Sequence, residues 1–177
     1  TNRVVVPNLD QRGTWTFWVA RKYAGNSEIR YMVPSAKTAS RRENVFQLKR
    51  IQSDEIFLTE GVFDAMLVGP DAVATYGTAV TSEQIRLIVE SGVSKVYCCF
   101  DSDAWMANLK TARLLRSFGI DAYVVDLPPG HDPATLKRQA ILELANKSHP
   151  WDFVRSCKTC LDRAHEHKIP KSDLMLV

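Results

Sequence analysis

Residues 95–103 read Lys-Val-Tyr-Cys-Cys-Phe-Asp-Ser-Asp, and this stretch decides the fold. Its first six residues predict a buried strand, and a helical pattern runs from Asp103 to Phe118, where Gly119 stops it. A strand that passes through acidic residues into a helix is typical of a parallel α/β sheet. The acidic residues then lie at the carboxyl end of the strand, which is where ligands bind in such sheets.

The same alternation of strand and helix continues on both sides of this stretch. Strands are expected at residues 55–59, 72–76 and 122–125, and helices at 61–68 and after Thr81, whose spacing to Gln84 is that of a capping box. Residues 133 to about 168 have a mainly helical pattern. The predicted fold class is therefore α/β, with a parallel sheet flanked by helices and followed by a helical extension.

The first fifty residues have a different, β-rich pattern. Short runs at residues 3–7, 14–20 and 28–33 are separated by turn signals and predict a small antiparallel meander. Strand alternation places Trp15 and Phe17 on one face, where we expect them in the core, and Trp18 on the other. Trp18 is therefore the candidate for stacking on single-stranded bases.

The net charge of +3 is unevenly distributed along the chain. Residues 1–53 contain ten basic and three acidic residues, a net charge of +7, whereas residues 54–132 contain five basic and twelve acidic residues, a net charge of −7. A basic block before an acidic block suits a protein that binds a polyanion with one part and metal cations with the other. Solvated faces of two unlike subdomains would give the same distribution, so charge alone leaves both interpretations open.

The composition excludes several classes of protein. A chain of 177 residues with 45% hydrophobic and 24% charged residues forms one soluble globular domain or two small ones, not a disordered chain. No apolar run approaches the roughly 18 residues that span a bilayer, so no membrane association is expected. Cys98 and Cys99 lie in the predicted buried strand rather than in a disulfide pattern, which favours a reducing, cytoplasmic setting.

Acidic residues follow the predicted strands at one edge of the sheet. The residues at these positions are Glu60, Asp101, Asp103, Asp126 and Asp132. Mg²⁺ takes oxygen ligands from one or two carboxylates and keeps waters for substrate phosphates, so we expect a metal site here. The alternative is that Asp101 or Asp103 simply caps the helix that follows.

Four motifs in this region, in this order and spacing, resemble the TOPRIM domain of bacterial and phage DnaG-type primases. They are Leu58-Thr-Glu-Gly-x-x-Asp64, Gly77-Thr78, Phe100-Asp-Ser-Asp103 and Leu127-Pro-Pro-Gly-His-Asp-Pro-x-Thr-Leu136. Upstream segments such as Val4-Val-Val-Pro7 and Trp18-Val-Ala-Arg21 are similar to the basic subdomain that precedes TOPRIM in these primases. The resemblance implies a basic β-rich subdomain at residues 1–53, a TOPRIM domain at 54–137 and a helical extension at 138–177.

The resemblance also implies roles for the acidic residues. Glu60 matches the invariant glutamate of the family, which is proposed to act as a general base or a metal ligand. Asp101 and Asp103 match the family's Mg²⁺-binding pair, so these three residues are expected to be catalytic. Asp132 matches the first aspartate of a further metal site, whose second aspartate is replaced here by Ala134.

Basic residues and glycines have counterparts in the family as well. Arg21 and Arg30 fall on basic positions thought to hold template or nucleotide phosphates, and Arg41 or Arg42 falls near another. Gly61 and Gly77 are expected to allow the backbone to approach closely where a side chain would crowd the metals. The family usually has Ala-Gly soon after the acidic pair, whereas this chain reads Ala104-Trp-Met106, which indicates a divergent member.

The implied activity is synthesis of short RNA primers on single-stranded DNA from ribonucleoside triphosphates, with Mg²⁺ or Mn²⁺ as cofactor. The implied setting is the cytoplasm of a bacterial cell or a phage-infected host. The implied partners are a replicative helicase and a zinc-binding domain that the family carries N-terminal to the region matched here. Two alternatives stay open: a TOPRIM nuclease, because the same carboxylates could activate water, and a non-catalytic DNA-binding module of a replisome.

One further group of residues has the spacing of metal ligands. It consists of Cys157, Cys160, His165 and His167. Their helical pattern points Cys157 and His165 to different faces, so we expect two ordinary helix cysteines rather than a zinc site.

Overall fold

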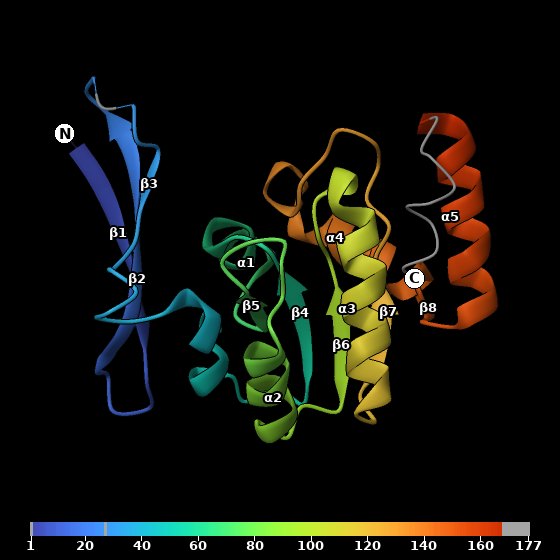
Figure 1. Ribbon diagram of the computed structural model, residues 1–177, viewed down its shortest axis with the longest axis horizontal. Helices are drawn as coiled ribbons and strands as arrows, with labels where there is room; N and C mark the ends of the chain where they lie inside the picture. The colour runs from blue at the N-terminus through green and yellow to red at the C-terminus, as the bar shows by residue number, and fades with distance from the viewer. Residues whose placement is uncertain (1, 27, 168–177) are drawn as a thin grey trace.

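The computed structural model describes residues 2–26 and 28–167, with the side chains of residues 164–167 left out. Its first part is a three-stranded antiparallel sheet in the order β1-β2-β3, built from β1 (Asn2–Leu9), β2 (Trp15–Ala24) and β3 (Tyr31–Met32) (Figure 1). The turn between β1 and β2 forms because the Asp10 side chain accepts hydrogen bonds from two backbone N–H groups. The predicted meander is confirmed.

The second part is a five-stranded sheet in the order β5-β4-β6-β7-β8. The strands β4 (Glu55–Thr59), β5 (Ala72–Ala74), β6 (Lys95–Cys98) and β7 (Asp121–Val124) are parallel, and β8 (His149–Pro150) runs antiparallel beside β7. The helices are α1 (Val62–Val68), α2 (Ser82–Glu90), α3 (Trp105–Ser117), α4 (Arg138–Lys147) and α5 (Phe153–His167).

Helices cover both faces of this sheet, as predicted. Buried residues of α1 and α4 pack on one face, whereas those of α2 and α3, such as Ile88 and Leu115, pack on the other. Four short 3-10 turns connect these elements: η1 (Arg41–Glu43), η2 (Leu48–Arg50), η3 (Ser102–Ala104) and η4 (Pro133–Thr135). The α/β fold class is therefore confirmed.

The capping box predicted at the start of α2 is present, and it also fixes a distant loop. The Thr81 hydroxyl accepts a hydrogen bond from the Gln84 backbone at 3.2 Å, and the Gln84 side chain accepts one from the Thr81 backbone at 3.0 Å. The Gln84 amide nitrogen then donates to three backbone carbonyls, those of Arg41, Asn44 and Thr75. A helix cap thereby ties η1 to the end of β5.

The N-terminal sheet packs directly against the parallel sheet. Phe17 of β2 is buried against Tyr76, with the ring centroids 4.7 Å apart, and Phe46 donates a backbone hydrogen bond to Ala74 at 2.8 Å. Trp15, which we expected beside Phe17 in the core, is 59% exposed, because a bulge between Asn8 and Leu9 shifts the register at that point. That prediction was wrong. The three-part division at residues 53 and 137 stays a prediction.

The region after residue 133 is mainly helical, as expected, except that β8 separates α4 from α5. No helix in the described ranges is long and apolar enough to cross a membrane.

Candidate functional site

Four carboxylates gather at the carboxyl ends of the parallel strands. Glu60 follows β4, Asp101 follows β6, Asp64 lies in the first turn of α1 and Asp132 precedes η4. All four line a single cleft of about 600 Å³. We call them the acidic cluster. They meet because parallel strands bring their carboxyl ends to the same edge of a sheet.

Glu60 is oriented by donors on both of its carboxylate oxygens. Its Oε1 accepts a hydrogen bond from the Asp101 backbone at 3.1 Å, and its Oε2 accepts one from the Thr78 hydroxyl. The backbone is fixed too, since Gly77 N–H donates to the Glu60 carbonyl at 3.0 Å. A carboxylate that accepts hydrogen bonds at both oxygens is held in one orientation.

Asp101 is the least satisfied member of the acidic cluster. Its Oδ1 is buried, and none of the described residues donates a hydrogen bond to it. Burial, and then the charges of Glu60, Asp64, Asp132 and Asp103, raises the pKa of Asp101 from its ordinary 3.8 to about 7. Asp101 occupies the N-cap position of η3 but makes no side-chain cap hydrogen bond, so helix capping does not account for it.

Asp64 and Asp132 differ in how they are held. Burial, and then the charge of Asp132, raises the pKa of Asp64 to about 6, although a hydrogen bond from the Ala134 backbone opposes this shift. Asp132 caps η4, where its Oδ1 accepts from the Thr135 backbone at 2.7 Å. Asp132 therefore has a structural role as well as a place in the acidic cluster.

The remaining two acidic residues lie outside this cleft. Asp103 is exposed and lines a neighbouring groove, from which its charge contributes to the raised pKa of Asp101. Asp126 lines the same groove and is ion-paired with Arg163. The structure therefore places Glu60, Asp101 and Asp132 in one cleft and Asp103 in the neighbouring groove. Asp126 is ion-paired with Arg163.

The acidic cluster fits a hard divalent cation. It offers carboxylate oxygens as ligands, the neighbouring acidic charges help to raise the pKa values of Asp64 and Asp101, and no described residue donates a hydrogen bond to Asp101 Oδ1. Within the described ranges, no three His, Cys, Asp or Glu side chains are already placed around one point as metal ligands. Mg²⁺ does not require such a set, because it commonly binds one or two carboxylates and keeps several waters.

Three arginines also line this cleft. The Arg21 guanidinium lies 4.8 Å from the Phe63 ring centroid, and that of Arg30 lies 5.5 Å from the Tyr31 ring centroid. Arg41 of η1 lines the same cleft. We call Arg21, Arg30 and Arg41 the basic wall. Stacking on an aromatic face restrains a guanidinium without using up its hydrogen-bond donors.

Two residues that the sequence predicts as nucleic-acid contacts, Trp18 and Arg42, do not line this cleft. Val19 and Arg21 of β2 point into it, so strand alternation places Trp18 on the other face of β2, where it is half-buried. Arg42 is exposed and is not among the lining residues, whereas Arg41 is.

The two predicted glycines are needed for different physical reasons. A Cβ atom at Gly61 would lie 2.5 Å from Asp64 Oδ2, so this glycine does allow a close approach. A Cβ atom at Gly77 would meet nothing within 4 Å, but the residue has φ +145°, which other residues rarely adopt. Gly77 is therefore required by its backbone conformation rather than by crowding.

The cysteines of α5 are free, with Cys157 half-buried and Cys160 buried. The side chains of His165 and His167, which completed the zinc alternative, lie outside the described residues. That alternative stays untested.

The sequence analysis assigned no role to Asp64 or Tyr76, which line the cleft, or to Thr78, which contacts Glu60. Asp64 could have been found, because an acidic residue four positions after Glu60 lies in the first turn of the next helix. The roles of Thr78 and Tyr76 depend on tertiary contacts, with Glu60 and Phe17 respectively, which the sequence pattern does not reveal.

Comparison with known proteins agrees with this geometry. Residues 57–136 match the Toprim-like family model. The DNA primase of Aquifex aeolicus is 34% identical over 143 residues, which cover 74% of this chain and 28% of that protein. The DNA primase of Haemophilus influenzae is 28% identical over 97% of this chain and 30% of its own length. The chain thus spans less than a third of the length of these relatives.

Solved structures of primase domains are also similar to this chain. The crystal structure of the Aquifex aeolicus primase, with its zinc-binding and RNA polymerase domains, matches with a TM-score of 0.74 and 28% identity, covering 93% of this chain and 44% of that one. The DnaG primase catalytic domain bound to single-stranded DNA matches with a TM-score of 0.70 and 26% identity, covering 84% and 52%. TOPRIM primases as a class depend on a divalent metal, which the acidic cluster fits. Residues 57–136 therefore form a Toprim-like domain, and the chain is similar in sequence and fold to the TOPRIM catalytic core of DnaG-type primases.

Proposed function

We propose that this chain is the part of a DNA primase that synthesises short RNA primers on single-stranded DNA by nucleotidyl transfer. The observation that carries the proposal is one cleft lined both by the acidic cluster and by the arginines of the basic wall. Nucleotidyl transfer needs both: carboxylates to hold cations at the reacting phosphate, and guanidinium groups to hold the remaining phosphates.

The acidic cluster is the proposed site of Mg²⁺ or Mn²⁺, with Glu60, Asp101, Asp103 and Asp132 as the proposed ligands. A divalent cation bound there lowers the pKa of a 3′-hydroxyl and neutralises charge on the triphosphate. Asp101 supplies an oxygen to which none of the described residues donates a hydrogen bond. Asp103 faces the adjoining groove, so it would serve the outer side of the site.

Glu60 has the geometry of a positioned base or ligand. Its two hydrogen-bond donors keep its carboxylate fixed at the end of β4. In that position it would either accept the proton of the attacking 3′-hydroxyl as a general base or help to hold a cation that lowers the pKa of that hydroxyl.

The basic wall is the proposed site for phosphates of the template or of the incoming ribonucleoside triphosphate. Arg21, Arg30 and Arg41 line the same cleft as the carboxylates. Arg42 and Trp18 remain proposed only as secondary contacts for DNA outside the cleft. Arginine suits this role because its planar fork binds phosphate oxygens in pairs.

The proposed partners extend beyond this chain. One structural neighbour is a catalytic domain bound to single-stranded DNA, and another includes a zinc-binding domain. By analogy we propose a single-stranded template, a zinc-binding domain and a replicative helicase as partners here. The proposed setting is the cytoplasm of a bacterial or phage-infected cell.

A single gel tests the proposal. A 5′-labelled primer annealed to a single-stranded template is incubated with the protein, ribonucleotides and Mn²⁺ or Mg²⁺, beside the Asp101→Ala/Asp103→Ala variant. Bands longer than the primer, lost in the variant, are the expected result. Shorter bands would indicate a TOPRIM nuclease, and an unchanged primer with intact DNA binding would indicate a non-catalytic module.

A further inference from the structure

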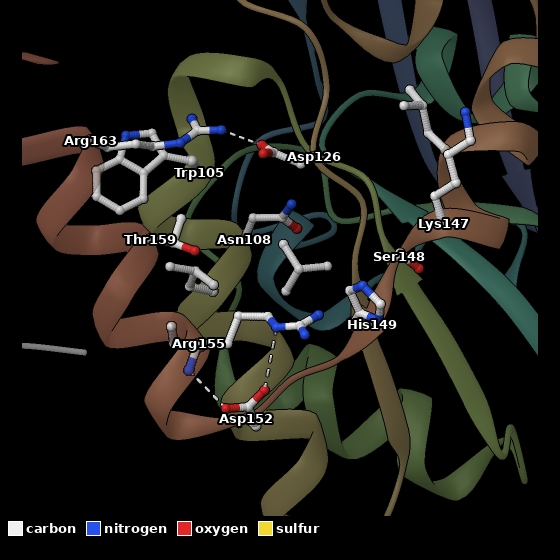
Figure 2. A pocket seen from close by; sticks show the side chains of 14 residues that line it. Trp105, Asn108, Asp126, Lys147, Ser148, His149, Asp152, Arg155, Thr159 and Arg163 are labelled. Atoms are coloured by element: carbon white, nitrogen blue, oxygen red, sulfur yellow. Dashed lines mark hydrogen bonds and ion pairs between the residues drawn. The ribbon is translucent and has the colours of Figure 1, made fainter.

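One side chain of α5 contacts the loop that carries Asp101 and Asp103. Arg163 Nη1 donates a hydrogen bond to the carbonyl of Ser102 at 3.2 Å, and its Nη2 is ion-paired with Asp126. Its guanidinium carbon lies 5.4 Å from the ring centroid of Trp105 (Figure 2). The Arg163 side chain is 18% exposed and that of Asp126 is 69% exposed, so the guanidinium is partly desolvated while its ion-pair partner faces solvent.

These three contacts join the segments that follow two neighbouring strands. Ser102 lies between the two aspartates after β6, and Asp126 lies just beyond the end of β7. Trp105 is the first residue of α3, at a position near which the family usually has a small residue. Its indole gives the guanidinium a flat surface, so Arg163 can donate toward Ser102 and Asp126 at once.

Arg163 also determines which carboxylates are available to a cation. Asp126 and Asp103 line the same groove, so an unpaired Asp126 would add a second carboxylate beside Asp103. The ion pair with Arg163 occupies Asp126 Oδ1 and offsets part of its charge. Figure 2 shows this pair at one end of the cavity between α3 and α5, away from Arg155 and Asp152 at the other end.

We infer that Arg163 is a positioning residue that holds the loop of Asp101 and Asp103 in its metal-binding geometry and sequesters Asp126. The inference rests on the proposed function, because it presupposes that Asp101 and Asp103 bind the metal. Arg163 acts through the Ser102 carbonyl and touches neither metal nor substrate itself. The helical extension thereby becomes part of the active-site support rather than a separate appendage.

The direction in which Mn²⁺ affinity changes when Arg163 is replaced separates this positioning role from a purely electrostatic one. Replacing Arg163 by alanine removes a positive charge and exposes the negative charge of Asp126, so Coulomb attraction alone would strengthen cation binding. A positioning role predicts the opposite, because the carboxylates lose their fixed geometry. Loss of an outer contact that orients metal ligands typically lowers metal affinity by about ten-fold or more.

The matched control is Arg155→Ala. Arg155 lies on the same helix and lines the same cavity. Its ion-pair partner is Asp152, the residue just before α5, so this pair joins residues of one local segment. It therefore reports on any general loosening of α5 without touching the aspartate loop. Arg163→Lys is a second variant, which keeps the charge and most of the aliphatic stem but lacks the planar fork.

The experiment is a calorimetric titration of Mn²⁺ into the full chain at pH 8, with thermal unfolding of each metal-free variant as a check of folding. We expect Arg163→Ala to bind Mn²⁺ about ten-fold more weakly than wild type, Arg163→Lys to fall between them, and Arg155→Ala to match wild type. If Arg163→Ala does not fold, weaker binding by folded Arg163→Lys than by Arg155→Ala supports the inference.

Two results overturn it in distinguishable ways. Equal or tighter Mn²⁺ binding by the Arg163 variants, while Asp101→Ala/Asp103→Ala abolishes binding, would refute the role of Arg163 and leave the proposed metal site intact. Binding that is absent in wild type, or unchanged in Asp101→Ala/Asp103→Ala, would refute the metal site and this inference with it.

Discussion

Lowering the pH from 8 to 6 is expected to weaken Mn²⁺ binding by about ten-fold, because the cation must displace the proton of Asp101. The pKa of Asp101 is raised to about 7, first by burial and then by the four acidic residues around it. A carboxyl group with this pKa is ionised in roughly nine molecules of ten at pH 8 but in roughly one of ten at pH 6. Asp64, with its pKa raised to about 6, is about half protonated at pH 6, so the acidic cluster also loses part of its negative charge there.

The same shifts predict how the metal-free protein responds to pH. In the unfolded chain both carboxyl groups titrate near their ordinary value of 3.8, whereas the native state keeps their protons up to pH 6 or 7. The native state thus binds more protons over this interval, so these groups make the free energy of unfolding fall as pH rises from about 4 to about 7. Saturating Mn²⁺ is expected to reverse this trend, because the cation stabilises the ionised form.

Calorimetric titrations at pH 6, 7 and 8, each in two buffers of different ionisation enthalpy, measure both the affinity and the protons released. Asp101→Asn is the control, because it keeps the shape of the side chain and removes its titration. Affinity that does not change between pH 6 and pH 8 in wild type would refute the reasoning. Proton release that persists unchanged in Asp101→Asn would show that another group carries it.

Three further predictions concern separate parts of the molecule. Thr78→Val removes the hydroxyl donor to Glu60 without changing shape, and is expected to lower kcat in primer extension about ten-fold; an unchanged kcat would mean that Glu60 needs no such support. Arg21→Ala is expected to weaken the salt dependence of single-stranded DNA binding, with the slope of log affinity against log salt falling in magnitude by about 0.7 if Arg21 contacts one phosphate. Fluorescence anisotropy measures this slope, and an unchanged slope would mean that Arg21 contacts no phosphate. Leu115→Ala empties a fully buried site between α3 and the sheet and is expected to cost about 2–5 kcal/mol in urea unfolding; a cost below about 1 kcal/mol would contradict the packing described.

Features set by local sequence were predictable. The alternation of strands and helices, the capping box of α2 and the stop at Gly119 depend on residues close together in the chain, and the structure has all three. The convergence of Glu60, Asp101 and Asp132 was also foreseeable, because a parallel sheet places its strand ends at one edge.

Features set by tertiary contacts were not predictable in the same way. β8 is two residues long and contains Pro150, so it has no strand pattern of its own and exists through its pairing with β7. The exposure of Trp15 depends on a bulge that alternation cannot reveal. The link from Arg163 to Ser102 joins residues 61 positions apart, so only the folded chain brings them together.

The most direct test of the central claim is to locate Mn²⁺ in crystals of the protein soaked with this ion, using anomalous diffraction. The account predicts a peak at the carboxyl ends of β4 and β6, within coordination distance of Asp101 Oδ1 and beside Glu60. The same peak is expected to be absent from crystals of Asp101→Ala/Asp103→Ala. Ordered Mn²⁺ bound only at other residues, or a peak that survives in this variant, would contradict the assignment of the acidic cluster as the catalytic metal site.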